Sequence, residues 1–450
     1  MKCKRFVRLM IAFSVMLALE AVVCAQPNAP SRTLDRLTTV SVSQLDALVE
    51  ENRYLELQRE LPAAKVTTAE RTYFEGILAD RTHHVSDAIA LLEKVLPEFK
   101  ARNARRAALA LRALASDYFE AGRYGDSAGA YATLLKSYSN QFPPADLHGF
   151  SDNLQTYELL RGAPAQRITG STSSTVATQR DPLGNTDVPV LIGKTEMWWM
   201  FDTGANVSTI SLSTAKRLRL AISKGQATTQ SGATGNEVPL HTAIIPELGL
   251  GGALIHNAVV LVMDDKELDI DFGDNRHYAI QGILGYPVLS ALGSFTFFED
   301  RLDVALASPS SSRCAPLYVQ DLTPLIAATS GGKDLAFSFD TGASTGTLTA
   351  KYFHAFPEQF ATLKPNRTSA GGAGGVRFMQ GYTLPSMELR LGTATAILHN
   401  IVVLTEPLGT GVLDSVYGNL GQALVAPFRS YTLDFGRMQL CLGGLGNHAE

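Results

Sequence analysis

The sequence has few cysteines, little net charge and no long apolar run beyond its first 25 residues. Its 450 residues include 4 cysteines and carry a formal net charge of −4. Without a strong basic cluster, nucleic acid is a poor candidate for a partner, and without a later run of about 20 apolar residues a stable membrane span is not expected. With 45% hydrophobic and 18% charged residues, the composition is typical of a globular protein with two or three domains.

The first residues carry the features of an export signal. Lys2 and Arg5 give the start a positive charge, residues 9–19 form a short apolar run, and the small residue Ala25 ends the segment. The apolar run is too short to span a bilayer comfortably. We therefore expect a signal peptide over residues 1–25 and an exported protein, either periplasmic or secreted.

The cysteines leave two questions open at the level of sequence. Cys24 could carry a lipid anchor, but Val23 before it is bulkier than the Gly, Ala or Ser that usually precede such a cysteine. Removal of the signal leaves Cys314 and Cys441 in the mature chain. In an oxidising compartment these two can form one disulfide, and the alternative is a pair of buried thiols.

Residues 34–160 have apolar side chains at helical spacing. The segments 75–99 and 109–138 each place a small residue, Ala88 or Ala128, near the start of a second helix, where paired helices approach closely. These segments resemble tetratricopeptide helical hairpins, although the two alanines are 40 residues apart, whereas tetratricopeptide units repeat about every 34 residues. Because helical arrays of this kind bind peptides or proteins, a protein partner is one expectation for this region.

The character of the chain changes after the helical region. Residues 162–180 are rich in small and polar residues, which predicts a linker. Beyond them, short apolar segments are separated by Gly, Asn, Asp and Ser, which predicts a β-rich region. The predicted fold is therefore multidomain, with an all-α helical-repeat domain and linker over residues 26–165 and an all-β region after it.

The β-rich region contains an ordered internal repeat. FDTGANVSTIS returns as FDTGASTGTLT, and two further segments recur in the same order at offsets of 138, 143 and 136 residues. The matched pairs are 201–211 with 339–349, 255–261 with 398–404, and 282–285 with 418–421. Three ordered matches at nearly constant offset predict two copies of one β unit, about 166–311 and 312–450, joined near 308–312.

Each copy places Asp-Thr-Gly directly after an apolar, strand-like segment. A glycine in this position permits a close approach that a Cβ atom would block. Two such turns meeting face to face would put Asp202 and Asp340 side by side. Two carboxylates about 3 Å apart share one proton, so one can take a proton from a water while the other donates to a carbonyl oxygen.

The duplicated region, residues 166–450, resembles an aspartic protease of the pepsin and retropepsin superfamily. Its Asp-Thr-Gly-Ala form is closer to retroviral-type lobes, here fused in one chain. The resemblance implies a bilobal all-β fold with endopeptidase activity, in which Asp202 and Asp340 are the catalytic pair that activates a water. It also implies that the following residues support the two turns: Thr203, Gly204, Thr341 and Gly342. The same chemistry requires no metal and no cofactor.

Two departures from the family pattern motivate an alternative. Asn419 stands where the family has an aliphatic residue on the strand behind the aspartate loop, the position that Ile283 fills in the first copy. The Gly-rich stretches 231–239 and 370–378 resemble flaps but contain no flap tyrosine. The alternative function is a catalytically silent peptide-binding or scaffold protein that uses the helical repeat and the cleft.

Two other chemistries are poorly supported by the sequence. Residues 125–129 read Gly-Asp-Ser-Ala-Gly, the pattern of a serine hydrolase elbow, but they lie in the helical region rather than between a strand and a helix. The 9 histidines show no metal-ligand spacing. We therefore expect neither a serine nucleophile nor a metal site.

Overall fold

The computed structural model describes residues 40–171, 173–232, 234–271, 277–305, 313–409 and 411–446. The predicted signal peptide over residues 1–25 and the predicted joint at 308–312 lie outside the described residues. Within the described part of the chain, no helix combines the length and apolar character needed to cross a membrane.

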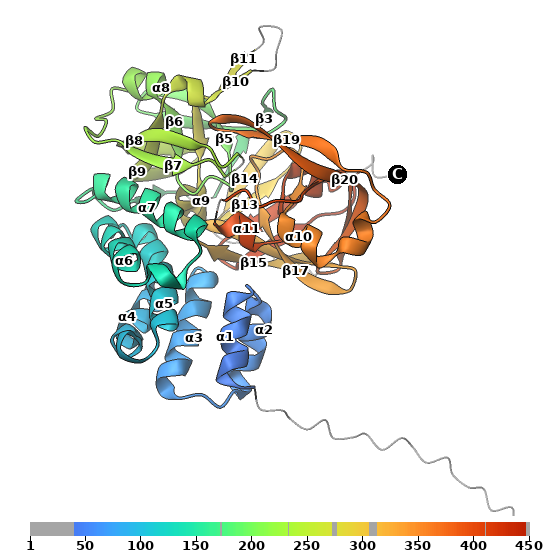
Figure 1. The fold of residues 1–450 in the computed structure, drawn as a ribbon. Coiled ribbons are helices and arrows are strands. Elements are labelled where there is room, and N and C mark those ends of the chain that lie inside the picture. Colours follow the sequence, from blue (N-terminus) through green and yellow to red (C-terminus); the bar gives the residue numbers. More distant parts are fainter. Residues whose placement is uncertain are drawn as a thin grey trace, which may run out of the picture. The chain divides into compact units, whose positions relative to one another are not determined.

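The described chain begins with seven α-helices, which Figure 1 shows grouped together in blue to teal. The first and third start with capping boxes, in which Ser41 and Gln44, or Thr67 and Glu70, satisfy each other's free backbone N–H groups. Successive helices from α3 onward pack on one another. The helices are α1 Val42–Glu50, α2 Tyr54–Glu60, α3 Thr68–Arg81, α4 Val85–Arg102, α5 Ala104–Glu120, α6 Tyr124–Ser137 and α7 Pro144–Leu159.

The small residues noted in the sequence lie at helix contacts. Ala88 in α4 and Ala128 in α6 are both fully buried, each in the second helix of a packed pair. Ser127, the central residue of the Gly-Asp-Ser-Ala-Gly pattern, is buried in α6, and its Oγ donates to the carbonyl oxygen of Ala115 at 2.5 Å. This serine is therefore part of the helix packing, as its helical context predicted.

The first part of the β region forms a sheet that closes on itself, because β8 pairs with both β4 and β9. A short helix, α8 Leu212–Arg217, follows β6, and α9 Tyr286–Leu292 follows β12. A small separate hairpin joins β10 Asp269–Asp271 to β11 His277–Ala279. The sheet strands are β1 Arg167–Gly170, β3 Gln179–Arg180, β4 Thr186–Ile192, β5 Thr195–Phe201, β6 Thr209–Ser211, β7 Ala227–Gln230, β8 Glu237–Leu250, β9 Ala253–Met263 and β12 Gly282–Leu284.

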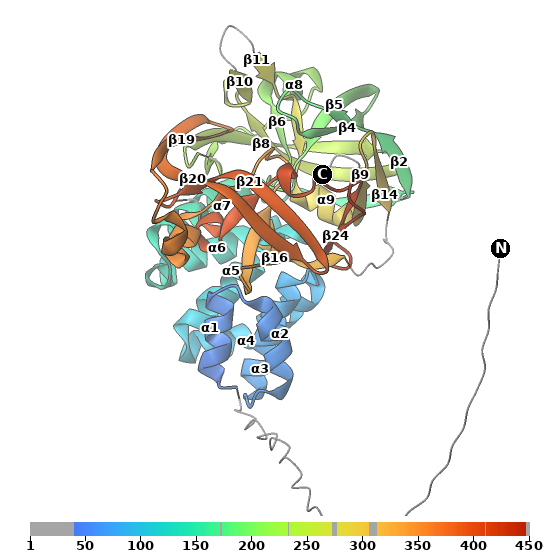
Figure 2. The same ribbon diagram turned by 90° about the vertical axis from the view of Figure 1, so that its right-hand side faces the viewer.

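A second sheet contains the remaining strands, and the long hairpin of β20 and β21 is prominent in Figure 2. It contains β2 Ser174–Ala177, β13 Ser294–Phe297, β14 Arg301–Ala305, β15 Cys314–Gln320, β16 Thr323–Ser330, β17 Lys333–Phe339, β18 Thr347–Leu348, β19 Asn366–Gly372, β20 Gly375–Leu391, β21 Ala394–Leu404, β22 Gly418–Leu420, β23 Tyr431–Asp434 and β24 Gln439–Leu442. Two short helices, α10 Ala350–Ala355 and α11 Val412–Ser415, accompany it. The fold is thus an N-terminal helical region followed by a β-rich region, which confirms the predicted fold class.

Strands from the two halves of the β region pair with each other. β13, from the first half of the repeat, pairs antiparallel with β23 from the second, so that Phe295 lies opposite Leu433. Phe297 stacks on Tyr431 with ring centroids 4.5 Å apart. Hydrogen bonds and buried aromatic rings therefore fix the two halves to each other.

The predicted linker at residues 162–180 is wrong in its central and C-terminal part. Arg167–Gly170 pairs with β9, Ser174–Ala177 with β14, and Gln179–Arg180 with β4. These strands are short and largely exposed at sheet margins, so most of their side chains are polar and they show no apolar alternation. The Ser- and Thr-rich composition that suggested a linker is equally suitable for a solvated edge strand.

Cys314 and Cys441 form a disulfide between β15 and β24, across 127 residues of chain. The two strands pair antiparallel, with these cysteines directly opposite each other. The structure thus selects the disulfide from the two alternatives that the sequence left open.

The helical region is joined to the β region by a buried interface. Arg112 of α5 is buried, and its guanidinium donates to Asp321 at 2.9 Å and to Asp146 at 3.1 Å. Asp321 lies in the turn between β15 and β16, far from α5 in sequence. Because a buried charge is costly unless it is paired, this ion pair ties the two regions together.

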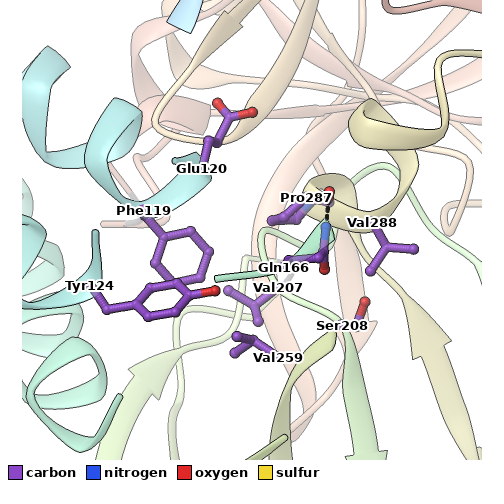
Figure 3. Close-up of a pocket in the computed structure, with 9 residues that line it drawn as sticks. All are labelled: Phe119, Glu120, Tyr124, Gln166, Val207, Ser208, Val259, Pro287 and Val288. Atoms are coloured by element: carbon purple, nitrogen blue, oxygen red, sulfur yellow. Dashed lines mark hydrogen bonds between the residues drawn. The ribbon is translucent and has the colours of Figure 1, made fainter. Parts of the chain in front are cut away.

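Two further contacts extend the interface. Figure 3 shows the side chain of Gln166 donating to the carbonyl oxygen of Pro287 at 2.9 Å, beside a small cavity lined by Phe119 and Tyr124. In Figure 1, helix α7 lies beside β7 and β8, and it contacts both strands. There Thr228 Oγ1 donates to the carboxylate of Asp152 at 3.1 Å.

Candidate active site

Asp202 and Asp340 each begin a loop at the end of a buried strand. The backbone N–H of Asp202 donates to the carbonyl oxygen of Leu284 at 3.1 Å, and that of Asp340 donates to Leu420 at 3.0 Å. Both acceptors lie on strands that run parallel to the strand before the aspartate, β12 beside β5 and β22 beside β17. The repeated sequence therefore gives two loops with the same backbone support.

The two threonines exchange hydrogen bonds between the loops. The backbone N–H of Thr203 donates to Thr341 Oγ1, and the backbone N–H of Thr341 donates to Thr203 Oγ1, both at 3.0 Å. Each hydroxyl in turn donates to a backbone carbonyl oxygen on the strand before the other loop. Thr203 donates to Phe339 at 2.7 Å, and Thr341 donates to Phe201 at 2.8 Å. Both threonines are buried, so these bonds hold the loops in one fixed arrangement.

The glycines allow each aspartate to lie against the opposite loop. A Cβ atom on Gly204 would stand 2.5 Å from Cγ of Asp340, and one on Gly342 would stand 2.4 Å from Cγ of Asp202. Each glycine N–H also donates to the aspartate of its own loop, at 2.8 Å to Asp202 and 2.9 Å to Asp340. Any larger residue would displace a carboxyl group, so glycine at both positions is what lets the two aspartates lie against each other's loops.

The electrostatics of the pair differ from those of an exposed carboxylate. Burial, followed by the charge of Asp340 and a hydrogen bond with it, raises the pKa of Asp202 well above its usual range. Backbone donors from Gly204 and Ala205 oppose this shift. The structure thus favours a proton on Asp202 at a pH where an ordinary aspartate is ionised.

Asn419 breaks the symmetry of the site. It lies on β22, opposite Ser338 of β17, in the position that Ile283 takes on β12 opposite Met200. Its side-chain Nδ2 donates to Oδ2 of Asp340 at 2.7 Å. The repeat located this residue as a departure, but composition and spacing could not show that its amide would point at the carboxylate.

The two Gly-rich stretches form hairpin tips that contact each other. Residues 231–236 connect β7 to β8, and Gly374 lies between β19 and β20. The side chain of Asn236 donates to the carbonyl oxygen of Gly374 at 2.9 Å, and Arg377 donates to that of Thr234 at 3.2 Å. The β7–β8 and β19–β20 hairpins therefore meet through polar contacts, and neither Gly-rich stretch contains a tyrosine.

The first aspartate loop also has indirect support from the helices. Asn206 Nδ2 donates to the carbonyl oxygen of Asp321 at 3.1 Å, and Thr323 Oγ1 donates back to Asn206 at 3.3 Å. The carboxylate of the same Asp321 pairs with Arg112. A contact between residues 209 positions apart has no local sequence pattern, so sequence reasoning missed it.

Among the described residues, no group of three or more His, Cys, Asp or Glu side chains is arranged to hold a metal ion. The polar groups gathered at the site are the carboxyl groups of Asp202 and Asp340, the amide of Asn419, and the hydroxyl groups of Thr203 and Thr341. This set can bind and polarise a water molecule, since it offers both a proton donor and a proton acceptor.

Comparison with protein families agrees with this chemistry. Residues 188–288 match a family model described as aspartyl protease. The matched range contains Asp202 and its loop, and it ends before the second aspartate loop. Fold, site and match together support a protease, a hydrolase of peptide bonds that acts on a peptide substrate. No curated protein matches the chain.

Proposed function

We propose that the protein is an exported aspartic endopeptidase built from two lobes of one chain, residues 166–311 and 312–450. Asp202 and Asp340 are its catalytic pair in this proposal. The observation that carries it is the placement of each aspartate over the glycine of the opposite loop, which brings both carboxyl groups within reach of one water. Both halves of the site come from the same chain, so the proposal needs no second copy.

In the proposed reaction, one carboxylate takes a proton from the bound water as the water oxygen attacks the peptide carbonyl carbon. The protonated partner donates to the carbonyl oxygen, which gives a tetrahedral diol. Breakdown of the diol reverses the roles, as a proton passes to the leaving nitrogen and the C–N bond breaks. Thr203 and Thr341 contribute by fixing the distance between the two carboxyl groups.

The surrounding structure is consistent with a role in enclosing a peptide. We propose that the β7–β8 and β19–β20 hairpins act as two flaps, which are closed in this structure through Asn236 and Gly374. We propose that the helices form a tetratricopeptide-like domain over residues 26–165, available to a protein partner and fixed to the lobes through Arg112. The disulfide supports export to an oxidising compartment, either periplasmic or outside the cell.

The proposal is tested by incubating the purified protein with denatured proteins and a peptide library from acidic to neutral pH. Cleavage that is blocked by a statine-type inhibitor, a mimic of the tetrahedral diol, is the expected result. Absence of cleavage at every pH, from protein that is folded by circular dichroism, contradicts it.

The second candidate function is a silent peptide-binding or scaffold protein, motivated by Asn419 and by the absence of a flap tyrosine. The separation of the carboxyl groups discriminates between the two candidates. A silent cleft has no need to hold them within hydrogen-bond reach, whereas a shared proton requires it. The placement of each carboxyl group against the glycine of the opposite loop therefore favours the enzyme.

A further inference from the structure

The strands behind the two aspartate loops pair with their neighbours in the same register but differ in one side chain. β12 and β22 pair in the same way with the strand before each loop and with the strand after it. At the matching position β12 carries Ile283, which has no hydrogen-bond donor in its side chain, and β22 carries Asn419. The donor reaches one aspartate and has no counterpart at the other.

We propose that Asn419 is a positioning residue that makes the pair directional: it holds Asp340 as the ionised base and leaves the proton on Asp202 as the acid. This inference rests on the proposed function, since the direction matters only for a pair that activates water. It gives Asn419, the residue that departs from the family pattern, a part in the proposed reaction.

The Asn419 side chain has two hydrogen-bond partners. Ser338 Oγ donates to Asn419 Oδ1 at 2.7 Å, which leaves Nδ2 directed at Asp340. With the amide reversed, two oxygens would face each other at 2.7 Å unless Asp340 were protonated. Ser338 Oγ also lies 3.3 Å from the carbonyl oxygen of Gly418, and a hydroxyl can accept as well as donate, so it is the ionised carboxylate of Asp340 that selects the amide nitrogen, and the serine hydroxyl satisfies the amide oxygen.

The donors around the two carboxyl groups are unequal. Asp340 accepts from Gly342 N–H and from the Asn419 amide. Asp202 accepts from the backbone N–H groups of Gly204 and Ala205, while Ile283 offers it no amide, and burial with the charge of Asp340 raises its pKa. A hydrogen bond to the charged form of a carboxyl group stabilises that form, so the single shared negative charge resides on Asp340.

Other elements around Asp340 bring mainly neutral groups. β17 contributes Ser338, and β18 places Thr347 opposite Asn419. Gln422 follows β22, and its amide donates to the carbonyl oxygen of Thr341 at 2.9 Å. Arg180 contacts the side-chain oxygen of Gln422, so its charge approaches the loop through that amide. Among the described residues, Asp202 is thus the titratable group that bears most directly on Asp340.

The assignment gives each proton a path. In the first step the water proton moves to Asp340, the water oxygen bonds to the carbonyl carbon, and Asp202 gives its proton to the carbonyl oxygen. In the second step Asp340 passes its proton to the leaving nitrogen, a diol hydroxyl returns a proton to Asp202, and the C–N bond breaks. Asn419 disfavours protonated Asp340, so it favours release of that proton in the second step.

The first test is the pH profile of kcat/KM for Asn419→Ile, which copies the residue of the first lobe. Loss of a hydrogen bond to a charged group moves the acidic limb upward by about one to two pH units. Ser338→Ala keeps the amide but releases its oxygen, and a smaller shift in the same direction is expected. Asn140→Ile makes the same change at an exposed position in the helical region and leaves the profile unchanged. An unchanged or lower acidic limb in folded Asn419→Ile and Ser338→Ala overturns the inference.

The second test reads the proton without activity. The carboxyl carbons of the full chain are labelled with ¹³C and titrated by NMR, and the two signals are assigned by their loss in Asp202→Asn and Asp340→Asn. Between the two titration steps, the Asp202 signal is expected to have the shift of a protonated carboxyl group and the Asp340 signal that of a carboxylate. The opposite assignment overturns the inference. If the wild type cleaves no peptide, the proposed function fails while this titration still decides where the proton resides.

Discussion

Thr203 and Thr341 each hold the other's loop, with backbone N–H groups and hydroxyl oxygens exchanged at 3.0 Å in both directions. The exchange joins two segments 138 residues apart and makes the position of one aspartate depend on the other. The geometry of the pair is therefore a property of the two loops together.

The first prediction concerns this exchange. Thr203→Val removes the hydroxyl and leaves the Thr341 N–H and the Phe339 carbonyl without their partner in a buried site. Each unsatisfied group costs about 1–3 kcal/mol, so a lower free energy of unfolding and a fall in kcat of at least tenfold are expected, in urea titrations and initial rates. Thr203→Ser keeps the hydroxyl and is the matched control. Equal behaviour of the two variants contradicts the proposed role of the hydroxyl.

A second prediction uses the glycines. Gly204→Ala places a methyl group where Asp340 now lies, 2.5 Å from its Cγ, so the carboxyl groups must separate. We expect proteolysis to be lost while circular dichroism remains unchanged. Gly129→Ala in α6, where a Cβ meets no atom within 4 Å, is the control; it should keep full activity and gain up to about 1 kcal/mol of stability. Full activity in Gly204→Ala is incompatible with the paired arrangement.

The sequence predicted the helical and β-rich regions and led directly to the two loops that the structure brings together, because a tandem repeat is visible in composition and order alone. It did not predict the strands within 162–180, since solvated edge strands need no apolar alternation. The pair of Arg112 with Asp321 and the direction of the Asn419 amide depend on tertiary contacts, which no local pattern encodes.

A third prediction tests the tie between the helices and the first loop. Arg112→Met leaves Asp321 and Asp146, whose side chains are each only 14% exposed, without their cation, and breaking a buried pair costs about 3–5 kcal/mol. We expect a lower free energy of unfolding and a reduced kcat, because Asp321 also holds Asn206 of the first aspartate loop. Arg123→Met, which breaks an exposed ion pair, should change stability by less than about 1 kcal/mol. Wild-type stability in Arg112→Met would refute this account of the interface.

A fourth prediction concerns pH. Burial, and then the charge of Asp181, raise the pKa of Asp187 to about 6. Its folded pKa exceeds its unfolded pKa of about 4, so its contribution to stability is full below about pH 4 and is lost as the pH rises through about 6. Asp187→Asn should therefore raise the free energy of unfolding at pH 7 by roughly 2–3 kcal/mol and leave it nearly unchanged at pH 4.

Chemical denaturation at both pH values measures this difference. Asp300→Asn, at a side chain that is 83% exposed, serves as the control and should change stability little at either pH. A gain of equal size at pH 4 and pH 7 in Asp187→Asn rules out ionisation as its cause.

The most direct measurement of the central claim is the rate of peptide cleavage by Asp340→Asn beside the wild type and Asp334→Asn. Asp334 is an exposed residue of the strand that leads to Asp340, so its substitution matches the chemical change without touching the pair. A water activated between Asp202 and Asp340 requires that Asp340→Asn lose at least about a hundredfold in kcat/KM, while Asp334→Asn cleaves as the wild type does. Cleavage by Asp340→Asn at the wild-type rate and at the same peptide bonds would contradict the account.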